Sequence, residues 1–133
     1  MSLRLDEFIG VPTELTLEEF LAWIDATPGQ VIKHNGRAVG TIYRHPKLGK
    51  IYVTKRLKSK HLFRRWGSVG ISRDVIIKLI KLQVDKIVIW FKDTGEVFTT
   101  TPKKFLMEGR ELWFGYEADS QLHLPLSEME KFL

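Results

Sequence analysis

The residues best suited to chemistry in this sequence form one basic run between Lys55 and Ser72. Cations alternate there with aromatic side chains, and the run closes on glycine and serine. The residues that we expect to contact the phosphates or bases of a nucleic acid are Lys55, Arg56, Lys58, Lys60, Arg64, Arg65, Trp66, Gly67, Ser68, Gly70 and Ser72. Lysine and arginine neutralise phosphates and release counterions, while an aromatic ring can stack on an unpaired base. The pattern predicts a site for a large anion, and a nucleic-acid backbone is the commonest one.

Two features of this run have a purely structural alternative. Phe63 belongs more naturally in the core beneath the loop than on a base, and for Trp66 both roles stay open. The segment from Gly67 to Ser72 can present backbone N–H groups to a phosphate at the start of a helix. It lacks the Gly-Lys-Ser/Thr ending of a P-loop, however, and two glycines can serve merely to turn the chain.

The elements that must position this run are a strand before it and a helix and a strand after it. The first strand is predicted over Lys50–Lys55, the helix begins at Ser72, and a continuous apolar run from Ile87 to Phe91 is typical of a central strand. A strand, a crossover helix and a strand form a unit whose two strands lie parallel. The basic run then follows the carboxyl end of a strand, where open α/β sheets place ligands.

The remaining elements complete a single domain over residues 1–133. A capping box of Thr16 and Glu19 starts a helix that Pro28 and Gly29 end, and Asn35-Gly36 joins two strands as a hairpin. Thr101 starts a short helix, strands are predicted over 112–116 and 121–124, and Ser127 starts a tail helix. We expect an α/β fold with a mixed sheet of five or six strands and a helix on at least one face.

The charges are unevenly distributed along the chain. Residues 26–73 contain twelve lysines and arginines and no acid, whereas residues 1–25 contain one base and six acids, and residues 74–133 contain eight bases and ten acids. A positive field concentrated in one segment favours a polyanionic partner. The simpler alternative is an exposed, lysine-rich sheet without a ligand.

Composition excludes several classes of protein. With no cysteine, the chain has no disulfide, no thiolate nucleophile and no cysteine-bound zinc. No apolar run has membrane-spanning length and no signal peptide is recognisable, so we expect a cytoplasmic protein without membrane contact. One asparagine and three glutamines, among many lysines, arginines and glutamates, give a composition typical of thermophiles.

The predicted order helix, three strands, helix, strand resembles the core of restriction-endonuclease-like nucleases and archaeal Holliday-junction resolvases, over residues 16–105. The resemblance implies an acid on the second strand and an acid-x-Lys motif on the third, which hold a catalytic metal. Here Lys55 matches the motif's lysine, but Val53 stands at the position of the acid, and residues 37–44 read RAVGTIYR. A non-catalytic relative is therefore expected. The stretch from His61 to Gln121 is also similar to small archaeal proteins of unassigned function.

The candidates for catalysis are few. His61 lies inside the basic run and can act as a general base without a metal, although a plain contact to phosphate or water is the simpler role. The four histidines share no metal-ligand spacing, so neither a metal nor a cofactor is predicted. We predict a nucleic-acid-binding domain and leave catalysis open. The alternatives are a nuclease whose catalytic acids are displaced and a protein-interaction module that binds an acidic partner.

Overall fold

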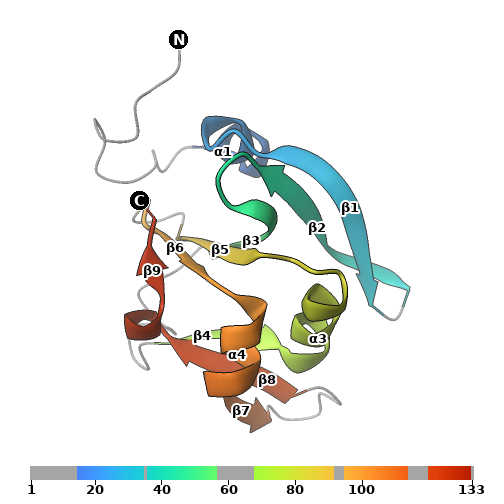
Figure 1. Cartoon of the computed structure of the whole chain (residues 1–133), viewed down its shortest axis with the longest axis vertical. Coiled ribbons are helices and arrows are strands. Elements are labelled where there is room, and N and C mark those ends of the chain that lie inside the picture. Colours follow the sequence, from blue (N-terminus) through green and yellow to red (C-terminus); the bar gives the residue numbers. More distant parts are fainter. Residues whose placement is uncertain (1–14, 35, 57–67, 92–94, 114–119, 133) are drawn as a thin grey trace.

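The structure of this chain is a computed structural model, and it describes residues 15–34, 36–56, 68–91, 95–113 and 120–132. The described residues build two sheets and their helices (Figure 1). The larger sheet has six strands in the order β1-β2-β3-β5-β6-β9, and the smaller has three in the order β4-β8-β7. The strands of the larger sheet are β1 (Thr27–His34), β2 (Arg37–His45), β3 (Gly49–Arg56), β5 (Lys86–Phe91), β6 (Val97–Thr100) and β9 (Glu130–Lys131).

The larger sheet is mixed, as predicted. β3 and β5 pair in parallel from Ile51 opposite Lys86 to Arg56 opposite Phe91, whereas every other neighbouring pair is antiparallel. Helix α3 (Arg73–Lys81) lies between β3 and β5 in the sequence, which confirms the predicted strand, helix, strand unit. β1 and β2 pair up to His34 and Arg37, which confirms the hairpin.

Helices and the small sheet cover the two faces of the larger sheet. Helix α1 (Leu17–Trp23) packs on one face, where the ring of Phe20 stacks on that of Trp90 with centroids 4.3 Å apart. The opposite face is covered by α3, by helix α4 (Pro102–Glu108) and by the small sheet of β4 (Ser68–Ser72), β7 (Arg110–Trp113) and β8 (Ser120–Pro125). Figure 1 shows α1 on one side of β3, β5 and β6, and α3 and α4 on the other.

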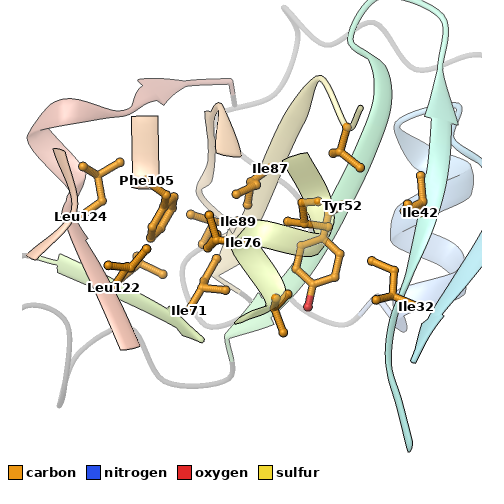
Figure 2. Packing of buried hydrophobic residues seen from close by; sticks show 14 of the residues in the cluster. Ile32, Ile42, Tyr52, Ile71, Ile76, Ile87, Ile89, Phe105, Leu122 and Leu124 are labelled. Atoms are coloured by element: carbon orange, nitrogen blue, oxygen red, sulfur yellow. The ribbon is translucent and has the colours of Figure 1, made fainter. Parts of the chain in front are cut away.

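The main core lies between the large sheet and this second layer. Alternate residues of neighbouring strands point into it, because successive side chains of a strand face opposite sides. Figure 2 shows Ile32, Ile42 and Tyr52 at one end of this core and Phe105 and Leu124 at the other. The larger sheet is thus buried on both sides at β5, whose last five residues are all less than 2% exposed.

Local signals explain where the helices begin. Glu19 N–H donates to Thr16 Oγ1 at 3.2 Å and Thr16 N–H donates to Glu19 Oε1 at 3.3 Å, which confirms the capping box. Thr101 Oγ1 accepts from the N–H of Lys104 at 3.1 Å at the start of α4. Among the helices that the structure describes, none has the length and apolar character that crossing a lipid bilayer requires.

The end of the first helix and the nature of the tail segment differ from the prediction. The first helix stops at Trp23 instead of continuing to Pro28, because Asp25 turns into the left-handed region with φ 62° and strand β1 begins at Thr27. The edge position of β1 accommodates Pro28, which has no N–H to donate. The predicted tail helix is only a 3-10 turn, Leu126–Glu128, after which β9 pairs with the open edge of β6.

Candidate functional site

The predicted phosphate-binding residues fall into three groups. Lys55 and Arg56 end β3, opposite Trp90 and Phe91 at the end of β5. The basic run therefore leaves the sheet at the carboxyl ends of two parallel strands, and the side chains of these two residues lie outside the described structure. Six further predicted residues also lie outside it, namely Lys58, Lys60, Arg64, Arg65, Trp66 and Gly67, and so does the catalytic candidate His61.

The third group, Ser68 to Ser72, corrects the prediction of a glycine loop. These residues form strand β4, which pairs antiparallel with β8, and Ser68 and Gly70 are buried. A Cβ on Gly70 would lie 2.5 Å from His123 Cε1, so this glycine makes room for a buried ring of the facing strand. A buried strand cannot offer a row of free N–H groups to a phosphate. Ser72 is the N-cap of α3 as predicted, but its side chain makes no capping hydrogen bond.

The described structure has a basic cleft that the sequence did not reveal. It lies between the edge strand β1 and the last turns of α3, and its volume is about 240 Å³. We call it the β1–α3 cleft; its lining residues are Gln30, Val31, Ile32, Lys33, Lys78, Lys81 and Leu82. Three of the seven are lysines and none is acidic. An anion that entered this cleft would therefore meet positive charge from both walls.

Two elements supply these lysines. Lys78 and Lys81 are three residues apart and so share one side of α3, where they lie in its last turns and suit the negative end of the helix dipole. Lys78 Nζ donates to the backbone carbonyl of Lys33, which joins helix to strand. Lys33 and Lys81 are exposed, and no carboxylate of the described residues forms an ion pair with either. Their mutual repulsion would be relieved by a bound anion.

A second cleft, of about 450 Å³, lies at the end of the sheet where β2 turns into β3 and α3 leads into β5. We call it the Arg44–Asp85 cleft; it is lined by Arg44, His45, Gly49, Lys50, Gln83 and Asp85. Asp85 Oδ2 accepts from the backbone N–H of Lys50 at 2.9 Å, and Lys50 Nζ donates to the carbonyl of Leu82 at 3.1 Å. Both charged side chains are thus held in place by backbone groups.

His45 forms the buried wall of this second cleft. Its Nδ1 accepts from the N–H groups of Lys47 and Leu48, each at 3.1 Å, and its ring lies edge-on to Phe132. Burial lowers the pKa of His45 below its usual 6.5, and the nearby charge of Lys47 lowers it further. A hydrogen bond to the Ile24 carbonyl and the carboxylate of Asp25 raise the pKa in the opposite sense. His45 is therefore neutral at pH 7 and adds no charge to the cleft.

No metal site is present within the described ranges, because no three histidine, aspartate or glutamate side chains come together there. Val53, at the position where the resemblance to nucleases implies an acid, is partly buried and packs against the cluster around Phe20 and Trp90. On β2, the residues with described side chains include no acid either. β2 and β3 thus carry no carboxylate at the positions that the resemblance implies.

Sequence reasoning missed the β1–α3 cleft for a clear reason. The spacing of Lys78 and Lys81 predicts only that both lie on the water-facing side of a helix. Lys33 is 45 residues from Lys78, and nothing local indicates that the edge strand lies beside the helix.

Comparison of the chain with protein-family models, with curated proteins and with solved structures gave no match.

Proposed function

We propose that this protein binds nucleic acid by contacting the phosphate backbone, with the β1–α3 cleft as one contact surface and residues 55–66 of the basic run as another. The observation that carries the proposal is the lining of the cleft, where Lys33, Lys78 and Lys81 converge from two elements without an acidic neighbour in the wall. Phosphate oxygens are natural partners for such ammonium groups, and each neutralised phosphate releases counterions.

The distribution of charge supports the same function. The segment with twelve bases and no acid, residues 26–73, contains β1, β2 and β3, which are neighbours at one side of the six-stranded sheet. Figure 1 shows β1 and β2 as a long curved ribbon at that side of the molecule. A polyanion that follows this side of the sheet meets successive cations from strands adjacent in space. Contacts of this kind fix the position of a backbone and do not select a base sequence.

The test is to measure, by fluorescence anisotropy, the binding of labelled DNA and RNA, both single-stranded and duplex, at low and at near-physiological salt. We expect measurable affinity that falls as salt rises. The double variant Lys33→Gln/Lys81→Gln should bind at least tenfold more weakly at low salt. The matched control is Lys103→Gln/Lys131→Gln, which removes two exposed lysines away from the cleft and should bind like the unaltered protein. Loss of affinity in both double variants alike would show that only net charge matters.

The basic run needs a separate test, since its side chains lie outside the described residues. Arg64→Ala/Arg65→Ala should weaken binding of the same probes under the proposal. Unchanged affinity would show that these two arginines of the basic run do not contribute to binding, and would leave the cleft as the contact surface. Absence of any affinity at low salt would overturn the proposal and favour a module that binds an acidic protein.

A nuclease is the second candidate, supported by one observation. The order α1, three antiparallel strands, α3 and a strand parallel to the third is the order that the resemblance implies, with β4 inserted before α3. Cleavage would require carboxylates from elsewhere in the chain, because Val53 occupies the implied position. Incubation of the same probes with Mg²⁺ or Mn²⁺, with and without a chelator, separates the two functions. Metal-dependent cleavage would establish that the protein is a nuclease. If the probes stay intact, nucleic-acid binding remains as the proposed function.

A further inference from the structure

We propose that the Arg44–Asp85 cleft is a binding site for a small phosphate monoester that carries hydroxyl groups, a sugar phosphate or a nucleoside monophosphate. The cleft is separate from the β1–α3 cleft, because the two share no lining residue. Its volume of about 450 Å³ lies in the range of small-molecule sites, roughly 300–1,000 Å³. A bare inorganic anion would fill only a small part of it.

The anionic end of the ligand is recognised by Arg44 and Lys50. A guanidinium presents its N–H groups in a fork that matches two phosphate oxygens. Arg44 is exposed, and it forms no ion pair within the described parts of the chain. The ammonium group of Lys50 gives one of its three hydrogens to the Leu82 carbonyl, so it is oriented before a ligand arrives and retains two donors. Preorganisation of this kind lowers the entropic cost of binding.

The polar body of the ligand is recognised by Asp85 and Gln83. Asp85 uses one oxygen to accept from Lys50 N–H, and a carboxylate has room for further donors. A bare anion is repelled by this carboxylate, whereas a hydroxyl group donates to it. Gln83 lies directly after the C-cap of α3 with φ 58°, and its exposed side chain lines the cleft with one acceptor and two donors. Two cations, one carboxylate and an amide together suit a ligand with an anionic end and a hydroxylated body.

The turn between β2 and β3 fixes the shape of this site. Gly49 has φ 80°, and a Cβ there would lie 2.4 Å from Asp85 Oδ2, so the backbone approaches the carboxylate more closely than any other residue type allows. His45 holds the same turn through its two hydrogen bonds to Lys47 and Leu48. The ligand-facing groups therefore rest on a braced turn.

The experiment is titration of the ¹⁵N-labelled full chain with four probes: ribose 5-phosphate, adenosine monophosphate, inorganic phosphate and adenosine. We expect both phosphate esters to shift the backbone amide signals of Lys50, Gln83 and Asp85 in a saturable way at millimolar concentration or below. Inorganic phosphate should bind at least tenfold more weakly than the better ester, and adenosine should shift none of the three. The two esters together show whether the base contributes to affinity.

Two variants and a control complete the test. Arg44→Gln should lower the affinity for both esters at least tenfold. Asp85→Asn keeps an acceptor for Lys50 N–H but removes the negative charge. It should therefore raise the affinity for inorganic phosphate and reduce the difference in affinity between inorganic phosphate and the esters. Lys33→Gln/Lys81→Gln should leave all four titrations unchanged, whatever its effect on nucleic acid. The inference is overturned by any of three results. These are that neither ester shifts the three amide signals, that Arg44→Gln binds the esters with unchanged affinity, or that the unaltered protein binds inorganic phosphate as tightly as the esters.

Discussion

His45 Nδ1 and the backbone N–H of Leu48 lie 3.1 Å apart, and the same nitrogen accepts from Lys47 N–H at the same distance. A ring nitrogen that accepts two hydrogen bonds cannot carry a proton, so this turn is built for the neutral imidazole. The ring also contacts Phe132 edge-on near the end of the described chain. One side chain thus connects the β2–β3 turn to a distant segment and couples the stability of both to pH.

Stability should therefore fall in weak acid. The pKa of His45 is lowered in the folded protein, mainly by burial, while the unfolded chain keeps a value of about 6.5. The unfolded state then takes up the proton first, so the stabilisation is complete above about pH 6.5 and is lost as pH falls toward the lower folded value. The loss is at most about 1.4 kcal/mol per pH unit for one proton. Urea unfolding at a series of pH values measures it.

His45→Asn is the matched control for this prediction. A short amide side chain can accept from the backbone two residues on, as in an Asx turn, but does not titrate. The difference between the unaltered protein and this variant isolates His45 from the other titrating groups. If both lose stability equally between neutral and weakly acidic pH, His45 is not the group responsible.

Gly49→Ala should destabilise the fold by about 2–4 kcal/mol, because it combines a positive φ with a collision against Asp85. Gly36→Ala provides the comparison, since Gly36 has φ 77° but its Cβ would meet nothing within 4 Å. That variant should lose only about 1–2 kcal/mol from the backbone conformation. Thermal and urea unfolding of the two variants would separate strain from collision. Equal losses would mean that Asp85 moves aside without cost.

Phe20→Ala should cost about 3–5 kcal/mol, since the ring is fully buried and stacks on Trp90. Phe20→Leu keeps most of the volume and should lose clearly less. Equilibrium unfolding in urea gives both values. A loss below about 1 kcal/mol for the alanine variant would show that α1 contributes little to the stability of the sheet.

The salt dependence of nucleic-acid binding should change by a defined amount. The logarithm of affinity against the logarithm of salt concentration has a slope of about −0.9 for each phosphate contact on duplex DNA. Lys33→Gln/Lys81→Gln should therefore make this slope less steep by about 2. Anisotropy titrations between about 50 and 200 mM salt measure the slope. An unchanged slope with weaker binding would mean that the two lysines act on the fold and not on phosphates.

The sequence predicted those elements whose signals are local. The capping box of Thr16 and Glu19 and the apolar run of β5 need no knowledge of the rest of the fold. β4 was missed because its serines and glycine suggest a turn, although Val69 and Ile71 alternate with these small residues as in a strand. β9 has two residues and exists only because β6 offers an open edge.

The candidate sites were less predictable than the fold. The charge of residues 26–73 directs attention to β1, β2 and β3, but it cannot place Lys78 and Lys81 beside them. The cleft around Arg44 and Asp85 requires the end of β2 to meet the segment after α3, and the two are about 40 residues apart. Contacts of that range depend on strand order, which the sequence pattern does not specify.

The contact between Lys78 and the carbonyl of Lys33 has a consequence for the behaviour of the protein at high concentration. β1 is an edge strand of the large sheet, and the backbone of an exposed edge can recruit a strand from another molecule. Here an ammonium group engages one edge-strand carbonyl, and Pro28 and two register shifts interrupt the ladder nearby. A second molecule that tried to extend the sheet would have to displace a lysine and bring its own positive charges against those of the first. We therefore expect the basic surface also to oppose extension of the sheet at β1.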